Sequence, residues 1–187
     1  MKLPIAIYLL LSSLLVFKKH AQDQYPSGTF KLDTSNTQIA FSAKHFGVLK
    51  VQGTFHEFSG QMNLKNGSII SGSLTIMVAS VSTNNNGRDR SLKSDDFLAE
   101  KKYPTIELEI IKDVNSPGEA QILARIKETK NIIDLEYKIH EDRGDFQLIG
   151  SCTISRKAFN LDFGTMDDLV SDEIIVQVNI SLERKKP

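Results

Sequence analysis

The sequence predicts an all-β protein in which antiparallel strands close into a single barrel of about eight strands. Apolar and polar residues alternate with a period of two along most of the chain, which is typical of strands with one face on a core. Short turn sequences rich in Gly, Asn and Asp separate these runs. A chain of 187 residues with 40% hydrophobic and 25% charged residues suits one domain with a full core.

Strands with one apolar face must either close on themselves or stack as a sandwich. Large and small residues mix on the inward face, as in Phe41 with Ala43 and Gly53 with Phe55. This mixture favours a barrel with a hollow interior over a sandwich, because Gly in a strand marks a bend or a close approach. The runs that alternate lie at 37–46, 48–64, 72–83, 104–114, 120–128, 131–142, 145–155 and 173–184. Turn signals lie at 65–68, 84–87, 115–119 and 141–145.

The longest connection, "GRDRSLKSDDFLAEKKYPTIEL" at 87–108, is densely charged. We expect a short helix within residues 88–102, with Ser94 as its N-cap and Pro104 preventing its continuation. Three acidic residues here, Asp89, Asp95 and Asp96, lack the spacing and the Gly of a calcium loop. We therefore interpret the charges as local ion pairs and turn caps, with Asp89 bonding the amides of its own turn.

The first 21 residues differ from the rest. "MKLPIAIYLLLSSLLVF" has one Lys followed by an apolar run that is too short for a typical membrane span. The pattern predicts a signal peptide at 1–21 and a mature domain at 22–187. An uncleaved anchor and a core element are the alternatives.

The residues that carry chemistry form no recognised catalytic or metal-binding motif. A net charge of zero disfavours binding to nucleic acid. His45 and His56 lack a third metal ligand at useful spacing, and the lone Cys152 is expected to be a small buried residue. Glu107 and Glu109 are expected to point outward. The sequence therefore predicts no metal and no catalytic residue.

Residues 155–164, "SRKAFNLDFG", place Phe159, Leu161 and Phe163 at alternate positions. We expect this segment to continue a strand past a bulge or bend, with Arg156 at the strand's end.

Several segments together resemble the YceI-like, polyisoprenoid-binding family. They are the opening "YPSGTFKLDTSNTQIAFSAKHFGVLKVQGTFHEFSGQMNL", the "VASVSTNNNGRDRSLKSDDFLAEKKYPTIEL" stretch, "ISRKAFNLDFG" and the closing "LVSDEIIVQVNISLE". The core "RDxxLKSxDF…YPxI" is the family's most specific signature. In "SRxxFGL", Asn160 stands where Gly is usual. The segment "AQILARIKETKNIIDLEYKI" departs from the family's "GxLTIxGxTxxV", so we expect that hairpin, and the ligand mouth with it, to differ in shape from the family's.

The resemblance implies a lipocalin-like barrel, periplasmic or secreted, that binds an isoprenoid lipid or quinone without catalysis. It also implies that Phe97 and Leu98 tuck under the charged connection. The inward-facing residues predicted to contact the ligand are Phe41, Phe55, Ile76, Leu108, Ile126, Leu135, Tyr137, Phe146, Leu148 and Val176. A bound isoprenoid lipid or quinone is the one cofactor-like group expected, and a homodimer is compatible with the sequence. The alternatives are a barrel enzyme acting on a lipid-like substrate through His45 or Tyr137, and a filled structural barrel that binds a protein partner.

Overall fold

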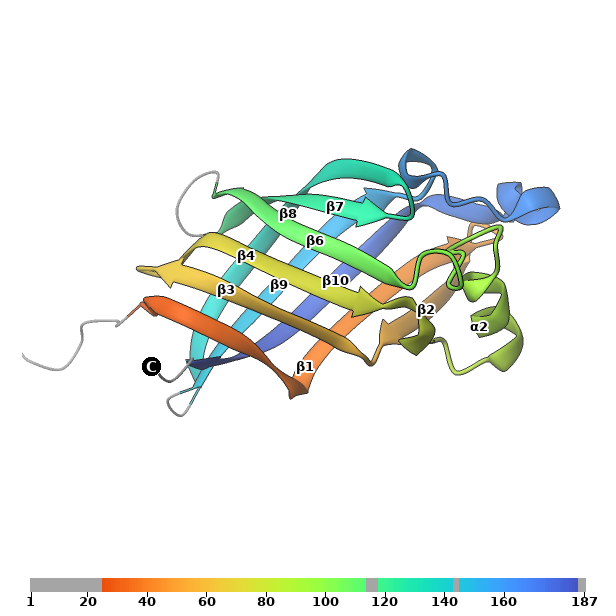
Figure 1. Cartoon of the computed structure of the whole chain (residues 1–187). Coiled ribbons are helices and arrows are strands. Elements are labelled where there is room, and N and C mark those ends of the chain that lie inside the picture. The colour runs from red at the N-terminus through yellow and green to blue at the C-terminus, as the bar shows by residue number, and fades with distance from the viewer. Residues whose placement is uncertain (1–24, 114–117, 143–144, 185–187) are drawn as a thin grey trace, which may run out of the picture.

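The computed structural model describes residues 25–113, 118–142 and 145–184, and these form ten strands in one antiparallel sheet (Figure 1). The strands are β1 Gly28–His45, β2 Leu49–Phe55, β3 Phe58–Lys65, β4 Ser68–Met77, β5 Val81–Ser82, β6 Thr105–Asp113, β7 Glu119–Ile126, β8 Thr129–Asp142, β9 Asp145–Ser155 and β10 Val170–Arg184. The helical elements are η1 Val78–Ser80, α2 Asn86–Lys93, η2 Lys157–Phe159 and η3 Gly164–Leu169. The signal peptide predicted at 1–21 lies outside the described residues.

The sheet closes because β10 pairs with β1 along most of its length, from Phe30↔Arg184 to His45↔Val170. Two of the wall's strands are interrupted. β3 pairs with the first part of β1 and β2 with the last part, and β4 is separated from β5 by η1. β2 and β3 together occupy one position around the wall, and so do β4 and β5. The ten strands therefore occupy eight positions in the closed wall. The predicted closed antiparallel barrel is confirmed.

The first part of β1 was not among the predicted strands. Its register against β10 shifts between Asp33 and Gln38. At this point the Asp33 carboxylate accepts hydrogen bonds from the Ser35 amide at 2.9 Å and from the Asn36 side chain at 2.6 Å. Such a side-chain turn bends the strand without ending it. The bend lets one strand pair with β3 before it and with β2 after it.

The barrel is packed solid at the end that carries the C-terminus, opposite α2 (Figure 1). The Phe30 and Phe146 rings meet edge to face with their centroids 5.7 Å apart. The Tyr137 side chain is 4% exposed, and its hydroxyl oxygen accepts a hydrogen bond from the Ile69 amide at 3.1 Å. These residues form a filled end, together with Leu64, Ala120 and Leu182.

The charged connection contains the predicted short helix, but the helix begins earlier than expected. The side chain of Asn85 caps α2 by accepting a hydrogen bond from the Arg88 amide at 3.0 Å. Ser94, predicted as the N-cap, stands instead at the C-cap, where its hydroxyl donates to the Ser91 carbonyl at 2.7 Å. Asn and Ser can both cap a helix. Gly87 in the first turn of α2 does not prevent the helix from beginning there. Within the described ranges, no helix has the length and apolar character needed to cross a membrane.

A candidate ligand-binding cavity

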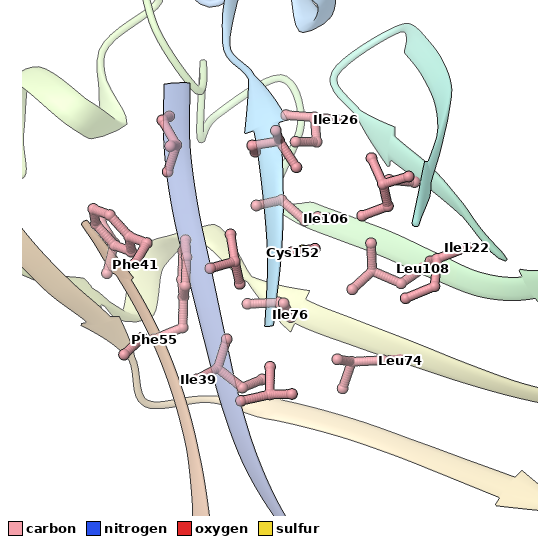
Figure 2. A pocket seen from close by; sticks show the side chains of 18 of the residues that line it. Ile39, Phe41, Phe55, Leu74, Ile76, Ile106, Leu108, Ile122, Ile126 and Cys152 are labelled. Atoms are coloured by element: carbon pink, nitrogen blue, oxygen red, sulfur yellow. The ribbon is translucent and has the colours of Figure 1, made fainter. Parts of the chain in front are cut away.

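The barrel encloses a cavity of about 450 Å³ that runs from the α2 end to Leu32 and Ile69, beside the filled end. This volume lies within the range of pockets that hold small-molecule ligands, roughly 300–1,000 Å³. Side chains from β1, β2, β4, β6, β7 and β9 converge on one space (Figure 2). The ten lining residues labelled there are Ile39, Phe41, Phe55, Leu74, Ile76, Ile106, Leu108, Ile122, Ile126 and Cys152. The barrel is therefore hollow, contrary to the filled-barrel alternative.

Eight of the ten residues predicted to contact a ligand lie on this lining: Phe41, Phe55, Ile76, Leu108, Ile126, Leu135, Leu148 and Val176. The other two, Tyr137 and Phe146, are absent from the lining and belong to the filled end. They are buried or half-buried, but Tyr137 bonds the Ile69 amide and Phe146 packs on Phe30, so neither contributes to the lining. Contact of any of the ten with a ligand stays a prediction.

Polar side chains on the lining are confined to the cavity's margins. Lys44, His45, Arg88 and Ser91 lie at the end near α2, and Gln61 and Ser73 lie on the β3–β4 flank. Lys44 is exposed and His45 is half-buried, so the cavity reaches solvent at the α2 end, which we call the mouth. Among the described lining residues there is no carboxylate. The interior therefore offers apolar contact along its length and polar contact at the margins.

Cys152, expected to be a small buried residue, is half-buried on the lining. Burial raises the pKa of its thiol to about 11. The thiolate is the nucleophilic form of cysteine, so this group stays a neutral thiol at physiological pH. It contributes an apolar surface to the wall.

The charged residues of the connection brace the mouth through Thr83, at the end of β5. The Arg88 guanidinium donates to the Thr83 hydroxyl and to its carbonyl, both at 2.9 Å. The Asp89 carboxylate accepts from the Thr83 amide at 2.8 Å and from its hydroxyl. These bonds fix α2 against the wall, with the buried Leu92 on the lining. Asp89 was expected to bond amides of its own turn, and instead it bonds Thr83, six residues earlier in the chain.

Below α2, Phe97 and Leu98 are each 5% exposed and line the cavity, as the family resemblance implied. The Phe97 ring stacks on Phe163 with centroids 4.2 Å apart and planes 21° apart. Because Phe163 follows β9 in the chain, this stack joins two segments that are distant in the sequence. The two segments together cover one side of the mouth.

Arg156 holds the second of these segments in place, a role that could not be seen in the sequence, where Arg156 was expected only at a strand's end. Its side chain is 1% exposed and pairs with the Asp167 carboxylate. It also donates to four carbonyl oxygens, those of Ser171 at 3.1 Å, Leu161 at 2.9 Å, Asp167 at 2.8 Å and Val170 at 2.9 Å. A guanidinium with five donors can satisfy this many acceptors at once. Arg156 therefore fixes the path of the chain over the mouth.

The prediction that residues 155–164 continue a strand is wrong. After Ser155 the chain forms η2, passes Asn160 in the left-handed region at φ 54°, and then enters η3. The turned backbone places carbonyls from residues 161 and 167 around the Arg156 side chain, which binds both. Phe159, Leu161 and Phe163 nevertheless all lie on the cavity lining.

Two carboxyl groups near Arg156 are held in their charged form. Hydrogen bonding from Arg156 is the main cause that lowers the pKa of Asp167, and burial opposes it. For Asp172, the hydrogen bond from the Lys157 amide is the main cause of a lowered pKa, followed by that from the Ser155 hydroxyl. These interactions stabilise the mouth segment rather than create an acid for catalysis.

The other candidate groups do not come together. His45 stacks on Phe46 with ring centroids 4.2 Å apart, and His56 is exposed beside Thr54. Glu107 and Glu109 point outward, and Glu107 pairs with Arg125 at 3.3 Å. Among the described residues, no group of three or more His, Cys, Asp or Glu side chains could hold a metal ion.

The fold and the cavity define a class of protein: a closed antiparallel barrel that encloses an apolar interior open at one end. The YceI-like domain family model matches residues 30–182, and the chain belongs to this family.

A UPF0312 protein of Staphylococcus aureus (strain bovine RF122 / ET3-1) is 32% identical over 82 residues, covering 43% of this chain and 48% of that protein. The chain thus spans about half the length of this curated relative. Two solved structures share the fold. BcnA of Burkholderia cenocepacia has a TM-score of 0.72 at 19% identity, covering 80% of this chain and 98% of that one. A polyisoprenoid binding domain from Saccharophagus degradans, implicated in plant cell wall breakdown, has a TM-score of 0.67 at 14% identity, covering 86% and 100%.

Proposed function

We propose that this protein binds an isoprenoid lipid or isoprenoid quinone in the barrel cavity and sequesters or carries it without catalysing a reaction. The observation that carries the proposal is the continuous apolar lining of a 450 Å³ cavity with polar groups only at its margins. The structural neighbour from Saccharophagus degradans is a polyisoprenoid binding domain, which supports the same ligand class.

The physical basis of binding is removal of a hydrocarbon chain from water. Transfer of each methylene out of water is worth about 0.8 kcal/mol. Ordering and immobilising the ligand offset part of this gain, so large ligands realise nearer 0.3 kcal/mol per non-hydrogen atom. A chain with about twenty buried carbons would then bind with about 6 kcal/mol, which corresponds to a Kd of tens of micromolar. Affinity should therefore depend on chain length more than on any single polar contact.

Binding without catalysis is favoured by the chemistry of the lining. Its thiol has a pKa of about 11, and Tyr137, one of two candidate catalytic residues, is bonded to the backbone at the filled end. His45 remains at the mouth, half-buried against Phe46. A catalytic role would require turnover of a prenylated substrate that a His45→Gln variant loses.

We also propose that the protein is exported and acts in the periplasm or outside the cell. The proposal rests on the signal-peptide pattern of residues 1–21. N-terminal sequencing of the protein from fractionated cells tests it. A mature chain that begins after Ala21 is expected, and a full-length chain in the cytoplasm would contradict it.

The test of binding is native purification, extraction with organic solvent and mass spectrometry of the extract. A prenylated lipid at near-stoichiometric amounts is expected. A second arm titrates the purified barrel with dansyl-labelled geranylgeranyl amine and follows its fluorescence. A folded protein that yields no lipid and takes up no prenyl probe would refute the proposal.

A further inference from the structure

Four of the large hydrophobic residues that are exposed lie together at the turn between β1 and β2. Phe46 is 57% exposed, Val48 83% and Leu49 58%, and Leu169 at the end of η3 is 36% exposed. The Phe46 amide donates to the Leu169 carbonyl at 2.8 Å, so the two segments are joined. We call these four residues the apolar tip. Exposed apolar residues that cluster, unlike scattered ones, mark an interaction site.

The backbone presents this tip in a fixed conformation. The Val48 amide donates to the His45 carbonyl at 3.3 Å, and Phe46 and Gly47 have φ values of 53° and 71°. A four-residue turn with two consecutive positive φ values is a tight hairpin turn that strongly prefers Asn, Asp or Gly. A Phe in such a position costs backbone strain, and unfavourable backbone conformations persist mainly where function requires them. The aromatic ring is therefore placed outward at the expense of local stability.

The tip borders the mouth of the cavity. Lys44, His45 and Val51 flank the tip residues of the hairpin and line the cavity, and Val170, next to Leu169, also lines it. The β1–β2 hairpin lies at the same end of the barrel as α2 (Figure 1). A ligand chain leaving the mouth would thus pass directly beside exposed apolar side chains.

Basic side chains stand directly behind the tip. Lys44 and Lys50 face each other across the β1–β2 ladder and are both exposed. His45 lies between Lys44 and the tip, and the exposed Asp168 is the acidic neighbour on the η3 side. An apolar projection backed by lysines is complementary to an anionic bilayer, where apolar groups enter the interface and each Lys near the surface contributes about 1 kcal/mol.

We propose that the apolar tip docks the barrel onto an anionic lipid bilayer, with the mouth facing the membrane for loading or release of the lipid. The inference rests on the proposed function for its purpose, but the contact itself depends only on the tip and the lysines behind it. A bilayer fits better than a protein partner because the exposed Lys44 and Lys50 beside the tip complement an anionic surface. A bilayer interface buries exposed apolar side chains without needing a pocket of matching shape.

The test is flotation of the full mature chain with vesicles of equal parts phosphatidylcholine and phosphatidylglycerol, or of phosphatidylcholine alone. We expect the wild type to float with the anionic vesicles. A Val48→Ser/Leu49→Ser variant should bind at least about tenfold more weakly, because it loses apolar area at the interface. Lys50→Gln should weaken binding to anionic vesicles about fivefold and leave the uncharged ones unaffected.

A matched control is Ile70→Ser/Ile149→Ser, which removes apolar residues that are 55% and 46% exposed elsewhere on the barrel. This variant should float like the wild type. The inference is overturned if the wild type does not float, or if the tip and control variants bind equally well. It is also overturned if the tip instead mediates a dimer that Val48→Ser/Leu49→Ser dissociates while vesicles stay unbound.

The dansyl prenyl probe in vesicle-free buffer separates this inference from the proposed function. Neither Val48 nor Leu49 lines the cavity, so the tip variant should bind the probe as the wild type does. Tip-dependent flotation without probe uptake by any variant would remove the proposed function and keep the membrane contact. Probe uptake without flotation would remove the membrane contact and keep the proposed function.

Discussion

Ala124 offers a direct way to shorten the cavity. It lies on β7 opposite Leu108 of β6, is 1% exposed, and lines the cavity. Ala124→Phe adds about six non-hydrogen atoms, which at the packing density of a protein interior displace about six ligand carbons. At about 0.3 kcal/mol per atom the loss is about 2 kcal/mol, or roughly a twentyfold weaker Kd for a prenyl ligand.

Fluorescence titration of Ala124→Phe with the dansyl prenyl probe measures this loss, and a thermal melt confirms that the variant is folded. The control is Ser151→Phe, which adds the same ring at an exposed position on the outer face of β9. It should bind the probe as the wild type does. A folded Ala124→Phe protein whose Kd stays within twofold of the wild type would show that the ligand does not occupy this cavity.

Four further results are expected. Arg156→Met should lower the free energy of unfolding in urea by about 3–5 kcal/mol, because it leaves buried acceptors unpaired. Arg156→Lys should recover only part of this free energy. A loss below about 1 kcal/mol for Arg156→Met would contradict the role of this network. Gly53→Ala would place a Cβ 2.3 Å from Cζ of Phe41, so the ring must move and probe binding should weaken; unchanged binding would argue against the packing described. Because burial raises the pKa of Cys152 to about 11, alkylation by iodoacetamide should be slow at neutral pH, accelerate about tenfold per pH unit and be blocked by bound probe. The pKa of Asp167 is lowered from 3.8 by Arg156, so its contribution to stability is present above that value and is lost as pH falls through the lower folded-state pKa; acid unfolding of Asp167→Asn should lack this component.

The barrel could be predicted from the sequence because its wall has an apolar inner face and a solvent-exposed outer face. Apolar and polar residues therefore alternate with a period of two along every strand. Alternation identifies the face of a strand but not the position along the barrel axis. Phe41 and Tyr137 both point inward, yet one lies on the cavity and the other in the filled end. The first part of β1 was missed because the turn at Asp33 interrupts the pattern, although Phe30 and Leu32 alternate correctly before it.

The mouth was harder to predict because tertiary contacts determine it. In the sequence, nothing distinguishes Arg156 from any other residue at the end of a strand. The carbonyl groups that accept its hydrogen bonds lie at 161–171, in a segment with no strong pattern of apolar and polar residues. The start of α2 was missed for a different reason. Asn85 and Ser94 are both good N-caps, and the bonds that Arg88 and Asp89 make to Thr83 decide between them.

The division of the barrel into a solid half and a hollow half separates the demands of folding from those of recognition. The edge-to-face pair of Phe30 and Phe146 and the Tyr137 bond to the Ile69 backbone anchor the chain far from the mouth. Residues such as Ala124 and Leu108 can therefore vary in size with a modest effect on whether the protein folds. Under the proposed function, one scaffold can thus take ligands of different width and length through substitutions at the positions that line the cavity.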